Sequence, residues 1–230
     1  MKQKIGIFGT GVVARTIGEK LQSLGHEVML GTRNVAVTSS RTEPGNYGEP
    51  GFKDWLAQHP QIKLGTYKEM AAFGEMLVNA TNGAGSLEAL NMGGKENLAG
   101  KVLLDIANPL DFSKGMPPSL SISNTDSLAE TIQRTFPDTK VVKSLNTMNA
   151  FVMVNPSIVP GDHNVFVSGN DTGAKETVNS VLKSFGWKEG NILDMGDITT
   201  ARGTEQLLPI WVRLWMTFQK PNFNFHIVFG

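Results

Sequence analysis

The residues best suited to chemistry form a glycine-rich turn close to the start of the chain. Residues 9–14 read Gly-Thr-Gly-Val-Val-Ala and have the spacing G-x-G-x-x-A, a variant of the dinucleotide-binding turn. In this turn Gly9 permits a tight bend, Gly11 lets the backbone approach a pyrophosphate, and Ala14 needs only to be small. The pyrophosphate binds at the start of the following helix, where unpaired N–H groups and the helix dipole attract an anion. We therefore expect Gly9 and Gly11 to bind a dinucleotide; the alternative is a turn that serves only the fold.

The end of the second predicted strand indicates which dinucleotide is bound. An NAD site usually has an acidic residue there, about 20 residues after the glycines, which binds the ribose hydroxyl. This chain instead has Thr32, Arg33 and Asn34. A guanidinium and a hydroxyl suit a 2′-phosphate, whereas a carboxylate would repel it, so we predict NADP(H) bound by this segment. Two alternatives stay open: Arg33 is an ordinary solvated cation, and Arg41 in the adjoining loop is either a second phosphate contact or a solvated side chain.

Small polar residues follow three further predicted strands. They are Thr81 and Asn82, then Asn108, then Asn146 and Thr147. Open parallel sheets bind ligands at the carboxyl ends of their strands, and such groups can hold an amide-bearing nicotinamide without adding charge. Each of these residues taken singly is more typical of an ordinary turn than of a ligand site, but their recurrence after three successive predicted strands favours a role in binding.

Other catalytic patterns are missing from the sequence. The four histidines have no metal-ligand spacing, so no metal site is expected, and no serine lies in a G-x-S-x-G turn. No lysine or tyrosine dyad for carbonyl reduction is evident. Lys143 is a weak exception, since it lies in a predicted strand and a lysine there is often structural. A hydride transfer between two bound rings fits this inventory, since it depends mainly on their alignment.

The elements that would position these residues alternate between strand and helix, which is typical of a doubly wound parallel sheet. We predict strands at 4–8, 26–30, 62–64, 76–80, 101–106, 140–144, 164–168 and 191–194. We predict helices at 13–24, 52–58, 68–73, from a Ser86 cap onward, at 127–136, 172–185 and 198–218. The segment 34–51 is expected to be a long surface loop.

This order predicts an α/β fold: a Rossmann-type, mostly parallel sheet with a small C-terminal helical part. Residues 1–150 would form the NADP-binding domain and 151–230 a sheet extension with helices, or the two would form one domain. The last predicted helix is apolar on more than one face, with Leu207, Trp211, Leu214, Trp215 and Phe218 along it. It is therefore expected in the core, in a subunit contact or along the wall of a substrate pocket.

Composition narrows the function further. The 21 basic and 21 acidic residues cancel, which argues against a nucleic-acid partner that neutralises phosphates. The absence of cysteine excludes disulfides and thiolate chemistry. No apolar run approaches the roughly 20 residues of a membrane span, and no secretory segment is evident, so we expect no membrane partner and a cytoplasmic location.

With these residues in view, the chain resembles a known family. Residues 9–14, 31–34, 105–109 and 200–205 are similar to segments of the NADP oxidoreductase, coenzyme F420-dependent family. The archetype of that family exchanges hydride between NADPH and a deazaflavin. The chain is also similar to the cytosolic NADPH domain of the six-transmembrane metalloreductases, but it lacks their membrane and haem portion, and its 34–51 loop is longer than in the archetype.

The resemblance implies specific contacts. It implies that Thr10, Val12 and Val13 also line the pyrophosphate turn, and that Thr32 and Arg33 contact the 2′-phosphate. The nicotinamide end would lie near three further residues, Asn82, Asn108 and Pro109. It also implies a homodimer whose last helices form the interface.

Three functions agree with the sequence. The first is an NADPH-dependent oxidoreductase that passes hydride to a deazaflavin, a flavin or a small electrophile beside Asn108 and Asn146. The second is a reductase of imines or beta-hydroxyacids, and the third a non-catalytic NADPH-sensing module.

Overall fold

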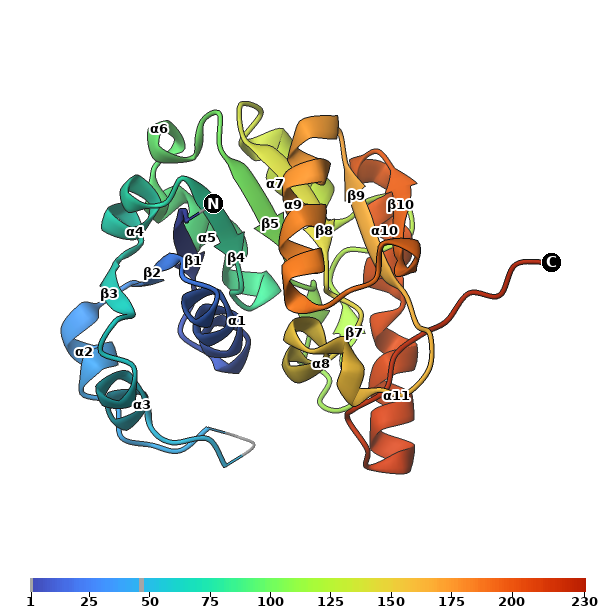
Figure 1. Cartoon of the computed structure of the whole chain (residues 1–230), viewed down its shortest axis with the longest axis horizontal. Helices are drawn as coiled ribbons and strands as arrows, with labels where there is room; N and C mark the ends of the chain where they lie inside the picture. Colours follow the sequence, from blue (N-terminus) through green and yellow to red (C-terminus); the bar gives the residue numbers. More distant parts are fainter. Residues whose placement is uncertain (1, 46–47) are drawn as a thin grey trace.

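The centre of the structure is a twisted eight-stranded sheet (Figure 1). The computed structural model describes residues 2–45 and 48–230. The strand order is β10-β9-β8-β5-β4-β1-β2-β3, and every pair is parallel except β8 with β9. The strands are β1 (Lys4–Phe8), β2 (Glu27–Thr32), β3 (Lys63–Thr66), β4 (Met76–Asn79), β5 (Val102–Asp105), β8 (Lys140–Ser144), β9 (Val165–Gly169) and β10 (Ile192–Gly196). The expected mostly parallel α/β sheet is confirmed, and it continues without a break across residue 150.

Helices cover both faces of this sheet, as a doubly wound fold requires. They are α1 (Val12–Ser23), α2 (Val35–Ser39), α3 (Phe52–Gln58), α4 (Tyr67–Phe73), α5 (Gly83–Gly93), α6 (Lys95–Leu98), α7 (Leu128–Thr135), α8 (Ala150–Val154), α9 (Thr172–Phe185), α10 (Ala201–Gln206) and α11 (Leu208–Phe218). Three single-turn 3₁₀ helices, η1 (Pro156–Ile158), η2 (Glu189–Asn191) and η3 (Ile198–Thr200), and a small antiparallel pair, β6 (Leu110–Asp111) with β7 (Ser119–Leu120), complete the described chain.

Strand β1 shows why its sequence is apolar at consecutive positions. Ile5 and Ile7 belong to the core cluster shared with Ile17 of α1, whereas Phe8 packs in the opposite cluster with Met70 of α4. Because successive side chains of a strand point to opposite faces, a strand covered on both faces must be apolar throughout.

Three local expectations were wrong. The 34–51 segment is not all loop, because Asn34 caps α2 by accepting a hydrogen bond from Val37 N–H at 3.0 Å. Helix α5 begins after Asn82, whose side chain accepts from Ala84 N–H at 3.2 Å, so Ser86 lies inside the helix. The helix expected over 198–218 is divided into η3, α10 and α11, since Pro209 cannot continue a hydrogen-bonded helix and instead lies in the first turn of α11.

The strand order reverses between β1 and β4. From β1 the chain winds outward through β2 to β3, then returns to the other side of β1 as β4. The connections after β1 and β4 therefore leave in opposite directions and open a crevice at the carboxyl ends of these strands. Among the described helices, none is both long and apolar enough to cross a lipid bilayer.

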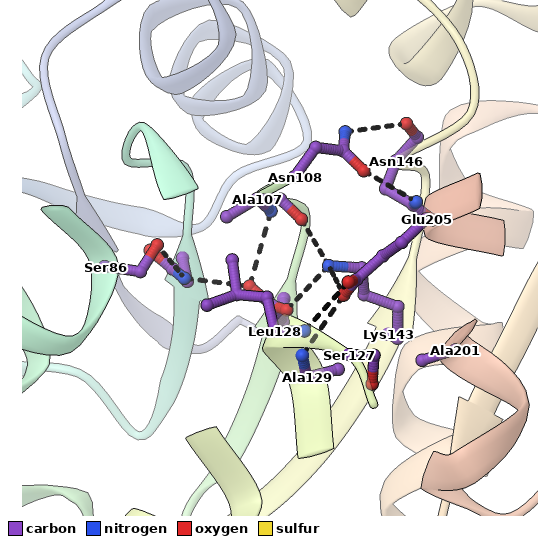
Figure 2. A network of polar contacts seen from close by, with 12 residues as sticks. Ser86, Ala107, Asn108, Ser127, Leu128, Ala129, Lys143, Asn146, Ala201 and Glu205 are labelled. Carbon is purple, nitrogen blue, oxygen red and sulfur yellow. Dashed lines mark hydrogen bonds and ion pairs between the residues drawn. The ribbon is translucent and has the colours of Figure 1, made fainter. Parts of the chain in front are cut away.

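A buried ion cluster joins the C-terminal part to the sheet (Figure 2). The Nζ atom of Lys143 on β8 lies 2.9 Å from Oδ2 of Asp105 on β5 and 2.9 Å from Oε1 of Glu205 on α10. Glu205 also accepts hydrogen bonds from Leu128 N–H and Ala129 N–H, at the start of α7. Burial by itself lowers the pKa of Lys143, but the two carboxylates outweigh it and raise the pKa above its ordinary value.

Replacing Lys143 by methionine should strongly destabilise the fold. The substitution leaves two carboxylates buried without their cation, a loss of about 3–5 kcal/mol in the free energy of unfolding. Chemical denaturation measures it. The matched control is Lys183→Met, which breaks an ion pair with Glu189 at the surface and should leave the midpoint unchanged. Equal midpoints for the two variants would show that the buried cluster contributes nothing.

Candidate functional site

The two glycines of the amino-terminal turn differ in what they do for the fold. Gly9 has a φ of +111°, and a Cβ there would lie 2.8 Å from the carbonyl oxygen of Ala80, so the turn itself requires glycine. Gly11 has an ordinary φ of −76°, and a Cβ there would meet no atom within 4 Å. The fold therefore does not require glycine at position 11. The open space above Gly11, at the start of α1, fits the close approach of a pyrophosphate.

A first hollow, the turn hollow, lies over this bend between β1, β2 and β4. Its volume is about 220 Å³. It is lined by Gly9, Thr10, Gly11, Arg33, Tyr67, Ala80, Thr81, Asn82, Gly85, Glu88 and Ala89. Arg33 is exposed there, and its Nη1 atom lies 4.0 Å from Oε2 of Glu88, also exposed, so this pair is weak. Burial raises the pKa of Tyr67 above its ordinary value.

The two residues that flank Arg33 in the sequence do not line the turn hollow. Thr32 is 7% exposed, and its Oγ1 atom is 2.7 Å from Oγ1 of Thr38. Asn34 uses its side-chain oxygen to cap α2. Neither residue lines the turn hollow, so in the described structure Arg33 is the part of the Thr-Arg-Asn segment that faces it.

A second hollow, the strand-end hollow, adjoins the first. Its volume is about 440 Å³, and it shares Gly11, Thr81 and Asn82 with the turn hollow. It is lined by Gly11, Val12, Val13, Ala80, Thr81, Asn82, Gly83, Ile106, Ala107, Asn108, Leu110, Phe112, Asn146, Met148, Met153, Leu208 and Trp211. The two hollows together form one path across the crevice, with the glycine turn midway.

Two of the predicted asparagines are paired in the strand-end hollow. Asn108 donates from Nδ2 to the carbonyl oxygen of Asn146 at 2.9 Å, and Asn146 donates from Nδ2 to Oδ1 of Asn108 at 2.9 Å (Figure 2). The carboxamides therefore bridge the ends of β5 and β8. Two other predicted residues do not reach the hollow: Pro109 is buried and accepts from Ser121 N–H, and Thr147 is 2% exposed.

The buried ion cluster lies next to this asparagine pair. Lys143 donates to the carbonyl oxygen of Ala107, and Asp105 accepts from Ala107 N–H at 3.3 Å, so both backbone polar groups of the residue before Asn108 are held (Figure 2). Asp105 also accepts from Nδ2 of Asn79 at 2.8 Å, which links β4 to β5. Lys143 does not line the hollow and is a structural residue, as its position within a strand indicated.

Sequence reasoning did not find the positioning roles of Asp105, Asn79 and Glu205. A usable signal was present, because Asp105 and Lys143 are ionisable residues inside apolar strands, where a charge is stable only if it is paired. The partner Glu205 was harder to find, since it comes from a helix more than 60 residues further along the chain.

The lining of the strand-end hollow has one chemical property that decides what it can do. It contains apolar groups, amides, the Thr81 hydroxyl and the Trp211 indole, and no Asp, Glu, Lys, Arg, His or Tyr among the described residues. The described residues likewise contain no cluster of three acidic or histidine side chains that could hold a metal ion. Such a hollow can orient a neutral ring but offers it no ionisable side chain as an acid or base.

A neighbouring apolar hollow extends this space. The aromatic hollow, of about 260 Å³, is lined by Val12, Val13, Met148, Asn149, Ala150, Phe151, Met153, Trp211, Trp215 and Pro221. Trp211 and Met148 line both it and the strand-end hollow. Two aromatic positions of the last predicted helix thus lie beside the crevice.

Comparison with known proteins agrees with this geometry. A sequence profile of the family described as NADP oxidoreductase coenzyme F420-dependent matches residues 4–109. A crystal structure from Arthrobacter sp. FB24, provisionally named an F420-dependent NADP-reductase, is 54% identical with a TM-score of 0.92, covering 99% of this chain and 100% of that one.

More distant relatives share part of the chain or the fold alone. Metalloreductase STEAP3 of Rattus norvegicus is 27% identical over 213 residues, which are 90% of this chain and 38% of that protein. The chain therefore spans less than half the length of this curated relative. An imine reductase from Myxococcus stipitatus is 14% identical with a TM-score of 0.62, covering 95% of this chain and 64% of that one, which shows the fold alone. The full-length identity to the Arthrobacter protein and the profile match over the glycine turn together establish that this chain belongs to the NADP oxidoreductase, coenzyme F420-dependent family.

Proposed function

We propose that this NADP-dependent oxidoreductase binds NADPH across the turn and strand-end hollows and transfers its hydride to a second redox cofactor or a small electrophile. The observation that carries the proposal is the absence of ionisable side chains from the described lining of the strand-end hollow. A hydride carries no proton with it, so its transfer depends on the distance and alignment of the nicotinamide carbon and the accepting ring atom, and a proton that the reduced acceptor takes up would come from water.

The proposed binding mode follows the charges along the crevice. The adenosine end would lie in the turn hollow, with Arg33 at the 2′-phosphate. The pyrophosphate would lie over Gly11, where no side chain intervenes. The nicotinamide would lie in the strand-end hollow, where Asn108 and Asn146 hold their carboxamides in a fixed pair.

The acceptor would approach from the side of α11. Bound NADPH supplies the hydride; the chain supplies the surfaces that orient both rings. Trp211, Met148 and Met153 line both the strand-end and the aromatic hollows, so a planar acceptor could pack against them beside the nicotinamide. Both a deazaflavin and a flavin have this shape, and the neutral lining does not distinguish them.

We also propose a homodimer in the cytoplasm, with residues 1–150 as the cofactor-binding domain and 151–230 completing the sheet and the α11 wall. Ile210 and Phe218 of α11 are 50% and 64% exposed, and such apolar surface is common where subunits meet. Light scattering measures the mass of the protein in solution and should give that of two chains. The mass of a single chain would exclude the dimer.

The function is tested by following NADPH oxidation with a deazaflavin, a flavin and a ferric chelate in parallel. Turnover with the deazaflavin or the flavin supports the proposal and identifies the acceptor, whereas turnover with the ferric chelate alone, a one-electron acceptor, would contradict a hydride transfer. Turnover only with small imines or hydroxy acids would instead support the second enzyme class. Tight NADPH binding without oxidation by any acceptor would support a sensing module.

Replacing Arg33 by alanine should weaken NADPH binding and leave NADH binding nearly unchanged. The loss is expected to be about 1.5–3 kcal/mol, the usual contribution of a hydrogen bond to a charged group. Titration calorimetry with both cofactors measures it. Glu88→Gln is the control, because removing the neighbouring carboxylate should not weaken NADPH. Equal losses for NADPH and NADH in the Arg33 variant would contradict the assigned role.

Replacing Gly11 by alanine should weaken NADPH and NADH alike without destabilising the fold. The added methyl group meets no protein atom within 4 Å but occupies the space proposed for the pyrophosphate. Gly9→Ala is the contrasting variant, and it should lower the melting temperature because of its positive φ and its contact with Ala80. Unchanged affinity in the Gly11 variant would show that nothing binds over the turn.

A further inference from the structure

Two arginines hold the segment between α2 and α3 against the glycine turn. Arg15 of α1 is 7% exposed and donates from Nε to the carbonyl oxygen of Thr10 at 3.1 Å and from Nη1 to that of Pro50 at 2.7 Å. Arg41 places Nη2 at 3.4 Å from both the carbonyl oxygen and Oγ1 of Thr10. The contacts of Arg15 are short and fixed, whereas those of Arg41 are at the long limit for a hydrogen bond.

The guanidinium groups of both arginines lie beside the same buried ring. Phe52 is 0% exposed, and the guanidinium carbons of Arg15 and Arg41 lie 5.5 Å and 5.4 Å from its centroid. Burial, and then the positive charge of Arg41, lower the pKa of Arg15. The charge of Arg41 thus acts on Arg15 unfavourably, and an anion bound in the hollow that both line would relieve this repulsion.

The space in front of these arginines is open to the pyrophosphate turn. The arginine hollow is lined by Gly11, Val12, Arg15, Arg41, Glu43, Pro44, Gly45, Glu49 and Asn82. Gly11 and Asn82 also line the turn and strand-end hollows, so all three meet where the pyrophosphate is proposed to lie. Arg33 lines the turn hollow but not the arginine hollow, which separates the two cations by position.

Two carboxylates share the arginine hollow. Glu43 and Glu49 line it, and the charge of Glu49 raises the pKa of Arg15, opposing the effect of Arg41. These carboxylates balance the arginines before a ligand arrives, and they would compete with a doubly charged pyrophosphate for the same guanidiniums.

We propose that Arg41 binds the pyrophosphate of the dinucleotide and that Arg15 is a positioning residue that holds the turn and the loop around it. The inference rests on the proposed function and deepens it, because it separates two recognition tasks. Arg33 would select the 2′-phosphate, and Arg41 would bind the part that NADPH and NADH have in common. The sequence left two alternatives for Arg41, a phosphate contact and a solvated side chain. The geometry favours a phosphate contact, with the pyrophosphate and not with the 2′-phosphate.

The test compares the affinities of four ligands for wild type and Arg41→Ala by titration calorimetry. NADPH, NADH and ADP-ribose contain the pyrophosphate; adenosine 2′-monophosphate does not. The variant should bind the first three about 10- to 150-fold more weakly, the equivalent of about 1.5–3 kcal/mol. It should bind adenosine 2′-monophosphate as wild type does.

Matched variants exclude a nonspecific effect. Lys53→Ala removes an exposed cation that lines none of the hollows and should leave all four affinities unchanged. Glu49→Gln removes a competing carboxylate and should tighten binding of the three pyrophosphate ligands several-fold.

The outcomes separate this inference from the proposed function. If wild type binds neither NADPH nor NADH, the proposed function is wrong. If wild type binds them and Arg41→Ala binds them equally well, only the role of Arg41 is wrong. An equal loss for adenosine 2′-monophosphate would show that Arg41 serves the loop as a whole or the 2′-phosphate, and would also overturn the inference.

Discussion

The reversal of strand order between β1 and β4 is the constraint on which the rest of the structure depends. Two adjacent strands whose connections leave in opposite directions cannot cover the space above their own ends. The glycine turn after β1 and the Asn82 cap after β4 border that space, and both contribute to the hollows on either side of it. The crevice in which we propose that the dinucleotide lies therefore follows from topology before any particular side chain is considered.

Charge is distributed unevenly along this path. Cations lie where phosphates are proposed, with Arg33 at one end and Arg41 near the middle. At the far end, the described lining of the strand-end hollow is neutral, although the fully buried Lys143 lies only one peptide group away from Asn108. This lysine is paired with two carboxylates and donates to the carbonyl oxygen of Ala107, so it holds the backbone beside the hollow and does not line it.

The same ion cluster explains how the C-terminal part contributes to the site. Glu205 ties α10 to β8 and to the start of α7. Helix α11 follows directly, and Trp211 reaches the edge of the strand-end hollow. The wall of the proposed acceptor site is thus positioned by a charged contact made deep in the core, one short helix earlier in the chain.

Much of the site could be predicted from the sequence because its signals are local. The spacing of Gly9 and Gly11, the strand and helix periodicities and the polar residues after the strands each depend on a few neighbouring residues. The sequence was less informative about the contacts that side chains make within the protein: beside Arg33, it did not indicate that Thr32 bonds to Thr38 or that Asn34 caps a helix.

By itself, then, the sequence determined the wound sheet, the glycine turn and the family, since each of these is encoded in short segments. Only the tertiary structure decided that Asn108 pairs with Asn146, that Lys143 is paired with Asp105 and Glu205, and that Arg15 and Arg41 both lie beside the ring of Phe52. These contacts join residues that are distant in the chain, and strand order and loop path, which periodicity does not encode, bring them together.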